Sequence, residues 1–87
     1  MEEQRVRVAL VFGGRSSEHS ISLLGAGSVL GVLDRSRYEV LPVGITRDGR
    51  WVLVPDDQRY VIDGGVLPEV DAAGAPVVLP SQGSSLV

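Results

Sequence analysis

A chain of 87 residues forms one small domain at most, and a domain of this size buries only a modest share of its surface. With 44% hydrophobic and 22% charged residues, the composition is that of a folded globular protein and not of a disordered tail. The net charge of −3, with no lysine and no cluster of arginines, argues against a nucleic acid or an anionic membrane surface as partner. The absence of cysteine excludes disulfides and thiol chemistry.

The N-terminal residues give no sign of a targeting segment. Met1 to Arg5 are acidic before the first apolar run begins, whereas a secretory signal has a basic start and a longer apolar core. No stretch approaches the roughly 18 apolar residues that a membrane-spanning helix needs. We therefore expect a cytoplasmic protein.

The run from Val6 to Phe12 predicts the first strand. It is rich in β-forming residues, almost continuously apolar, and bounded sharply by Gly13 and Gly14. Runs of this kind are typical of a strand that is buried on both faces of a parallel sheet.

The segment from Ile21 to Asp34 predicts a helix. Apolar residues recur there at spacings of three and four, the period of a helical face: Leu23, Ala26, Leu30 and Leu33. Other apolar residues fall on a second side, so we expect the helix to be covered from two directions. Either Ser16 or Ser17 is a suitable residue to cap its N-terminus, because a serine hydroxyl accepts a hydrogen bond from the free N–H groups there.

A second strand is predicted from Tyr38 to Thr46, followed by a hairpin. Pro42 has no N–H to donate, so we expect this strand to lie near an edge of the sheet or to bulge at that point. Asp48-Gly49 separates it from the apolar run Trp51 to Val54, and Asp-Gly between two β-rich runs indicates a tight hairpin turn.

The pattern is weaker from Pro55 onward. Residues 60–62 suit a short strand or a helix end, residues 71–76 suggest a flexible loop, and residues 81–85 resemble a linker. Two secure strands and one helix are too few for a free-standing doubly wound domain. The predicted fold class is therefore α/β: the N-terminal part of a Rossmann-like open parallel sheet that is incomplete in this chain.

In open α/β sheets, ligands bind beyond the carboxyl ends of the strands, which here means residues 13–20. Adjacent glycines and a helix N-terminus would suit an anion. The common phosphate motifs do not match, however, because the loop reads G-G-R-S-S-E and the chain has no P-loop lysine. Glu18 beside the helix start would repel phosphate and would suit a substrate that carries an ammonium group.

Two motifs carry a resemblance to a known family. The string from Val11 to Leu23, V-F-G-G-R-S-S-E-H-S-I-S-L, resembles the opening signature of D-alanine–D-alanine ligases. The stretch from Gly44 to Trp51, G-I-T-R-D-G-R-W, resembles a second motif that the family has at the same distance. The two matches stand in the right order and cover residues 5 to about 54.

The resemblance implies an ATP-grasp enzyme whose N-terminal domain has the pre-ATP-grasp fold. Such an enzyme phosphorylates the carboxylate of one D-alanine with ATP and Mg²⁺ (Mn²⁺ is a possible substitute), and the amine of a second D-alanine attacks the acyl phosphate. The dipeptide serves peptidoglycan synthesis, and family members are usually homodimers. Residues 1–87 would form a partial substrate-binding domain. The lysines and acidic residues that bind nucleotide and metal would lie outside it, so no metal ligand is expected here and the segment alone should be inactive.

The resemblance also assigns candidate site residues. Glu18 matches the acidic residue that binds the ammonium of the first D-alanine, so it is the candidate catalytic and substrate-binding residue, with His19, Gly13 and Gly14 as further substrate-binding residues. Ser20 stands where the family often has a glutamate. Without the resemblance, Glu18 would be only a helix-start acid that stabilises the helix by about 0.3–1 kcal/mol. His19 suits a surface or supporting role better than that of a catalytic base.

Two alternatives remain open from the sequence. One is the equivalent domain of another ATP-grasp ligase, such as a D-alanine–D-lactate ligase. The other is a free-standing ligand-binding α/β module, which would need a complete sheet within these 87 residues.

Overall fold

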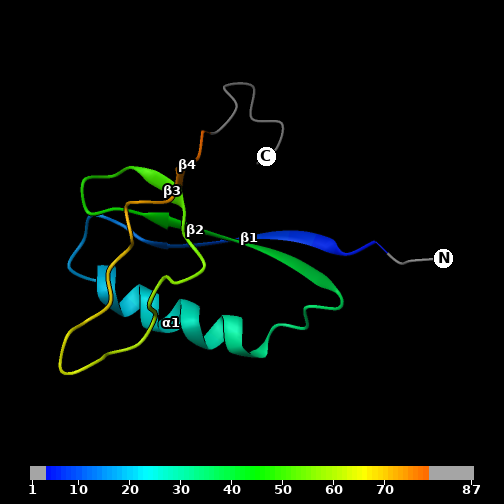
Figure 1. The fold of residues 1–87 in the computed structure, drawn as a ribbon, viewed down its shortest axis with the longest axis horizontal. Coiled ribbons are helices and arrows are strands. Elements are labelled where there is room, and N and C mark those ends of the chain that lie inside the picture. The colour runs from blue at the N-terminus through cyan, green and yellow to red at the C-terminus, as the bar shows by residue number, and fades with distance from the viewer. Residues whose placement is uncertain (1–3, 79–87) are drawn as a thin grey trace.

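A computed structural model of the chain describes residues 4–78 and shows a mixed sheet with one helix against it (Figure 1). The elements in chain order are β1 (Val6–Gly13), α1 (His19–Val32), β2 (Tyr38–Ile45), β3 (Trp51–Leu53) and β4 (Ala75–Pro76). They pair in the order β1-β2-β3-β4. The α/β class is thereby confirmed. The predicted linker at residues 81–85 lies outside the described residues.

Strands β1 and β2 pair in parallel over their whole lengths, from Val6 opposite Tyr38 to Gly13 opposite Ile45. The connection between them is helix α1, as a parallel pair requires. Both predicted strands are confirmed, with ends shifted by one residue. Gly13 and Ile45 therefore finish at the same edge of the sheet, where the loop that leads into α1 begins.

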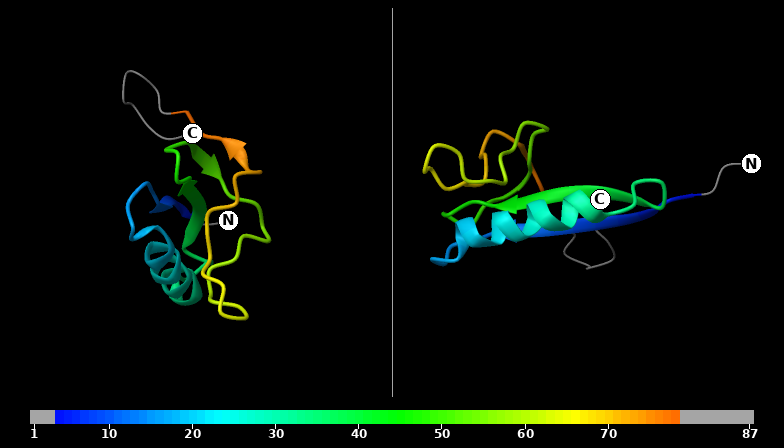
Figure 2. Two further views of the ribbon diagram at one scale, coloured as in Figure 1. Left: turned by 90° about the vertical axis from the view of Figure 1, so that its left-hand side faces the viewer. Right: turned by 90° about the horizontal axis from the view of Figure 1, so that it is seen from below.

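The core lies between α1 and one face of the sheet. It contains these buried residues: Phe12, Leu23, Ala26, Val52 and Val54. The views in Figure 2 place α1 on one side of the strands. Val11 points to the other side and is 42% exposed. The expectation that β1 is buried on both faces is thus wrong for residues 4–78, because they supply a helix to only one face.

Helix α1 begins at His19, two residues earlier than predicted, and Glu18 is its N-cap residue without a side-chain capping bond. Neither candidate serine caps the helix. Ser16 instead accepts a hydrogen bond from the Glu18 N–H one step before the helix (3.1 Å). The expected cover from two directions is wrong at Ile21 and Val32, which are 58% and 83% exposed. The loop does lie against the helix at Gly27, where an added Cβ would come within 2.8 Å of Tyr60, and Leu24 is half-buried.

The expectation that Pro42 puts β2 near an edge or in a bulge is wrong. β2 pairs with β1 on one side and with β3 on the other, in regular register. The carbonyl of Pro42 accepts a hydrogen bond from the Val54 N–H (3.1 Å), so the nitrogen of Pro42 also faces the β3 side. Strand β3 has already ended at Leu53, and the missing N–H therefore interrupts no ladder bond between strands.

The predicted hairpin between β2 and β3 is confirmed, with antiparallel pairing of Ile45 with Trp51 and a positive φ of 93° at Gly49. Thr46 organises the turn. Its N–H donates to the Arg50 carbonyl (2.8 Å), and its hydroxyl accepts from the Arg50 N–H (2.9 Å) and donates to the Asp48 carboxylate. The hydroxyl of a nearly buried threonine thus joins both ends of the loop.

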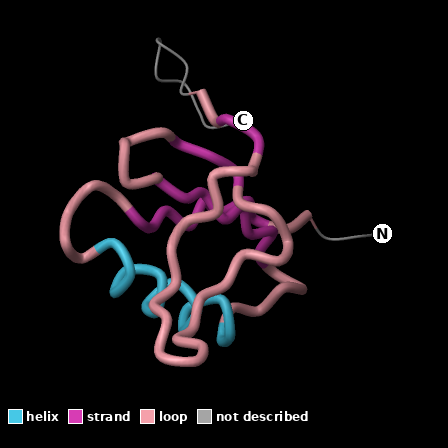
Figure 3. The backbone as a smooth tube through the Cα atoms, turned by 60° about the vertical axis from the view of Figure 1, so that its left-hand side comes forward, coloured by secondary structure: helices cyan, strands magenta, loops and turns pink. Residues whose placement is uncertain are grey.

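A long loop, residues 54–74, returns from β3 to β4 alongside α1 (Figure 3). The residues at 60–62 form neither a strand nor a helix end, and the predicted loop at 71–76 ends in the two residues of β4. Gln58 holds this loop together. Its side-chain amide donates to the carbonyls of Arg59 (2.7 Å) and Glu69 (2.8 Å) and accepts from the Asp71 N–H (2.7 Å).

Among residues 4–78, the one helix lacks both the length and the apolar character that a membrane crossing requires.

Gln58→Leu should destabilise the chain. Leucine fills a similar volume but leaves three backbone groups without their partner, and an unmade hydrogen bond in a buried place costs about 1–3 kcal/mol. We expect the free energy of unfolding, measured by urea titration of Trp51 fluorescence, to fall by at least about 2 kcal/mol. Asp57→Ala, an exposed neighbour, is the control and should change it by less than about 0.5 kcal/mol. Equal effects of the two variants would contradict this role of Gln58.

Asp48→Asn should remove part of the acid sensitivity of folding. The hydrogen bond from Thr46 lowers the pKa of Asp48, and the Arg50 guanidinium acts in the same direction. A lowered folded-state pKa means that the stabilisation is complete above the unfolded value, about 3.9, and is lost as the pH falls through the folded value. In urea unfolding at a series of pH values, the free energy of unfolding of wild type should exceed that of the variant at neutral pH, and the two should converge as the pH falls through the folded-state pKa of Asp48. A difference that is the same at every pH would refute the linkage.

Candidate functional site

The loop that leaves β1 begins with two glycines in the left-handed region, with φ of 91° at Gly13 and 108° at Gly14. Gly13 is closely surrounded. A side chain there would collide with the backbone oxygen of Ile45 and would come within 2.7 Å of a methyl group of Val70. At Gly14 an added Cβ would meet nothing within 4 Å. The first glycine is thus required by packing, whereas the second borders open space.

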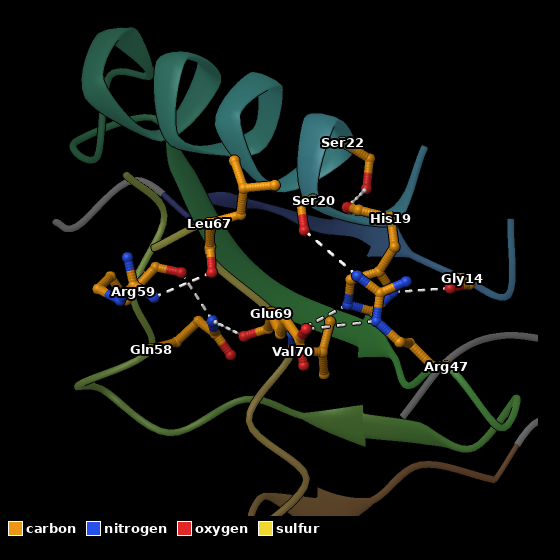
Figure 4. A network of polar contacts seen from close by, with 10 residues as sticks. All are labelled: Gly14, His19, Ser20, Ser22, Arg47, Gln58, Arg59, Leu67, Glu69 and Val70. Carbon is orange, nitrogen blue, oxygen red and sulfur yellow. Dashed lines mark hydrogen bonds and ion pairs between the residues drawn. The ribbon is translucent and has the colours of Figure 1, made fainter. Parts of the chain in front are cut away.

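His19, the first residue of α1, is buried and only 1% exposed. Its Nδ1 lies 2.7 Å from the carbonyl oxygen of Gly14, and its Nε2 lies 3.1 Å from the backbone nitrogen of Val70 (Figure 4). A backbone N–H can only donate and a carbonyl can only accept. Nε2 must therefore be the acceptor and Nδ1 must carry the proton, so the imidazole is neutral and held in one tautomer.

Ser22, one helical turn further on, fixes the same junction from the other side. Its hydroxyl donates to the carbonyl of His19 (2.7 Å) and accepts from the N–H of Gly13 (2.7 Å). Gly14 closes the end of the sheet, because its N–H donates to the Ile45 carbonyl (2.8 Å).

Glu18 stands between the glycine loop and the helix, and its side chain is exposed. Its backbone is held on both sides: the N–H donates to the Ser16 hydroxyl (3.1 Å), and the carbonyl accepts from the Ser22 N–H (2.9 Å). Within residues 4–78 no hydrogen bond or ion pair engages its carboxylate. The structure thus presents a carboxylate without a partner on a fixed backbone, at the carboxyl edge of the sheet.

A group of contacts beside His19 could not be predicted from the sequence. Arg47 lies with Nε 3.5 Å from the Glu69 carboxylate, and its guanidinium donates to the hydroxyl of Ser20 (3.4 Å). Ser20 is 5% exposed, so the residue that stands in place of a glutamate is buried under this arginine. Both Arg47 and Glu69 are at least half exposed, and their pairing contributes little stability by itself. Its effect is to connect the β2–β3 turn, the helix start and the segment before Val70.

The structure therefore brings all four candidate residues, Gly13, Gly14, Glu18 and His19, into one junction between β1 and α1. Their side chains differ in direction. The His19 ring is enclosed and has both nitrogens engaged by the backbone, while the Glu18 carboxylate faces solvent. An exposed carboxylate on a rigid backbone can bind a cationic group through charge-assisted hydrogen bonds. Direct contact of any of these residues with a substrate stays a prediction.

The described residues offer few ligands for a divalent metal ion. Across residues 4–78, no three His, Asp or Glu side chains gather closely enough to hold a metal. The chain also has no lysine to place against a phosphate. The donor chemistry of the site is that of a carboxylate beside backbone groups.

A family model described as the D-ala D-ala ligase N-terminus matches residues 7–79. Among curated relatives, a D-alanine–D-alanine ligase of Kineococcus radiotolerans is 56% identical over 90% of this chain. Ligases of the same name from Streptomyces coelicolor and Rhodococcus jostii are 51% and 50% identical over 90% and 100% of it. The matched part is 21%, 24% and 25% of those three proteins, so the chain spans about a quarter of their length.

Two solved structures have a similar fold. The VanG D-Ala:D-Ser ligase from Enterococcus faecalis matches with a TM-score of 0.67 and 28% identity, over 88% of this chain and 22% of that protein. The D-alanine–D-alanine ligase from Coxiella burnetii matches with the same TM-score and 21% identity, over 90% and 22%, and shows the fold alone.

Gly13→Ala should be more harmful than Gly14→Ala. Both substitutions carry the cost of positive φ for a residue with a Cβ, about 1–2 kcal/mol. Only the first adds a collision with Ile45 and Val70. We expect the free energy of unfolding to fall by about 1–2 kcal/mol for Gly14→Ala and by clearly more for Gly13→Ala, in urea titrations of Trp51 fluorescence. Equal losses would mean that Gly13 is not confined as described.

Proposed function

The chain belongs to the D-alanine–D-alanine ligase N-terminal family, and on this premise we propose that it supplies the amino-acid-binding loop of an ATP-dependent D-alanine–D-alanine ligase. One observation carries the proposal. The carboxylate of Glu18 is exposed and unengaged within residues 4–78, where the loop after a parallel strand enters the helix, on a backbone that hydrogen bonds hold in place. Ligands of open α/β folds bind at this edge.

In the proposed complex, Glu18 binds the ammonium group of the first D-alanine. An ammonium offers three donors and a carboxylate only accepts, so the pair forms charge-assisted hydrogen bonds. The open space beside Gly14 allows the small amino acid to approach the backbone. Anchoring the ammonium leaves the substrate carboxylate directed away from Glu18 and available for activation. Orientation of this kind lowers the barrier of a reaction between two bound molecules.

The complete reaction is part of the proposal because the chain spans about a quarter of its relatives. It is the ATP-driven joining of two D-alanines through an acyl phosphate, with Mg²⁺ or Mn²⁺. Both ATP and the metal ion would be bound by other parts of the complete enzyme, and the lack of a cluster of metal ligands within residues 4–78 agrees with this. We further propose a cytoplasmic homodimer that serves peptidoglycan synthesis.

The second substrate is the point at which related ligases differ. The chain is 28% identical to the VanG D-Ala:D-Ser ligase. D-serine is therefore an alternative second substrate, as is D-lactate. The identity of 50–56% to D-alanine–D-alanine ligases favours D-alanine. Family membership over residues 7–79 also favours a ligase segment over a free-standing binding module.

The test is a chimera in which this chain replaces the matching N-terminal segment of the Kineococcus radiotolerans ligase. D-alanine-dependent release of phosphate from ATP is measured for the unmodified chimera, for Glu18→Gln and for Glu18→Ala. Loss of a hydrogen-bonded charge partner weakens binding by about 10- to 100-fold, so we expect KM for the first D-alanine to rise by that factor or turnover to be lost. Asp57→Asn, an exposed carboxylate away from the loop, is the control and should leave KM unchanged.

An unmodified chimera without D-alanine-dependent activity would contradict the proposed function. Normal KM and turnover in Glu18→Gln would show instead that Glu18 is only an acid at a helix start, and the family assignment would stand without this residue's role.

A further inference from the structure

We infer that His19 is a positioning residue: its Nδ1–H bond to Gly14 sets the shape of the glycine loop and thereby the place of the Glu18 carboxylate. The inference rests on the proposed function, because it gives Glu18 a substrate to bind. The imidazole itself is buried and contacts the backbone with both nitrogens, so it acts through Glu18 and not on a ligand.

The bond between His19 and Gly14 closes the loop. Gly14 and His19 are five residues apart, and the bond of 2.7 Å between the ring and the Gly14 carbonyl ties the two ends of residues 14–19 together. Glu18 lies inside this closed segment, next to the residue that closes it. Gly14 has an open surrounding and a positive φ, so the bond from His19 is the contact that fixes the direction of its carbonyl group.

The other nitrogen of the ring is bonded to a distant segment of the chain. Nε2 accepts the N–H of Val70, which is 51 residues away in the chain. Val70 lies between two residues whose backbone is held by Gln58: the Glu69 carbonyl accepts from its amide, and the Asp71 N–H donates to it. The ring is therefore bonded to a segment that Gln58 holds in place. Through its two bonds, the ring fixes the loop relative to that segment.

The two bonds of the ring have different consequences. The bond to Gly14 shapes the loop that carries Glu18, whereas the bond to Val70 attaches the returning segment to the helix. A purely structural histidine would lose about the same stability from the loss of either bond, since each is one buried hydrogen bond to the backbone. A positioning histidine would in addition lose substrate affinity only when the Gly14 bond is lost.

Two amide substitutions separate these bonds. In His19→Asn the side-chain nitrogen reaches the position of Nδ1 and can still donate to Gly14, but nothing reaches Val70. In His19→Gln the longer chain places the amide oxygen near the position of Nε2, where it can accept from Val70, and the donor at the Nδ1 position is gone. The two variants are thus matched in polarity and each retains one of the two contacts.

The measurement uses the same chimera, with KM for the first D-alanine, kcat and the melting temperature determined for each variant. We expect similar losses of melting temperature, a KM within about twofold of the unmodified chimera for His19→Asn, and a KM raised about fivefold or more for His19→Gln. The KM for ATP should be the same in both variants. Equal KM values for D-alanine in the two variants, or a larger rise in His19→Asn, would overturn the inference.

Failure of this inference can be told from failure of the proposed function. If the unmodified chimera is active and Glu18→Gln raises KM while the two His19 variants behave alike, only the positioning role is wrong. If Glu18→Gln leaves KM unchanged, the role of Glu18 is wrong, and with it the premise on which the inference stands.

Discussion

Two hydrogen bonds to one buried imidazole join parts of the chain that the β-sheet does not hold together. His19 belongs to the start of α1, Gly14 to the loop after β1, and Val70 to the segment that returns toward β4. A buried ring with an unpartnered nitrogen would be costly, because a polar group removed from water needs a replacement for its hydrogen bonds. The ring is therefore stable in its place only when all three segments are correctly arranged, and each segment depends on the others.

The neighbouring residues His19 and Glu18 have two different tasks in this arrangement. His19 faces the interior and keeps the loop in shape, while Glu18 faces solvent with a backbone that its neighbours have already fixed. A backbone held in this way loses little freedom when a ligand binds, so only the side chain of Glu18 has to be ordered. Gly13 completes the arrangement, since only a residue without a side chain fits between Ile45 and Val70.

The sequence predicted the parts of the fold that depend on neighbours along the chain. The apolar run of β1, the spacing of Leu23 and Ala26 in α1 and the Asp48-Gly49 turn are local patterns, and the structure confirms each of them. The exposure of Val32 and the place of Pro42 inside the sheet were predicted wrongly. Both depend on what lies beside the element in space: which faces a helix covers, and where the neighbouring strand ends.

The same limit applies to the candidate site. Glu18 could be named as a candidate because a carboxylate after a glycine turn is visible in the sequence and the loop resembles the signature of a known family; its role stays a prediction. The contacts of His19 with Val70 and of Arg47 with Glu69 could not, because they join residues 51 and 22 positions apart across the fold. A lone histidine in a polar stretch gave no indication of burial, and the weak pattern after Pro55 concealed that Gln58 organises the segment on which the ring rests.

In the proposed complex, the carboxylate of Glu18, in the loop that His19 closes, binds the ammonium of an amino acid. The most direct test is a crystal structure of the chimeric ligase with D-alanine and a non-hydrolysable ATP analogue. We expect the ammonium nitrogen of a bound D-alanine to lie within about 3.2 Å of a Glu18 carboxylate oxygen, with the His19–Gly14 bond retained. A D-alanine whose ammonium is bound by other groups, with Glu18 left in solvent, would contradict it.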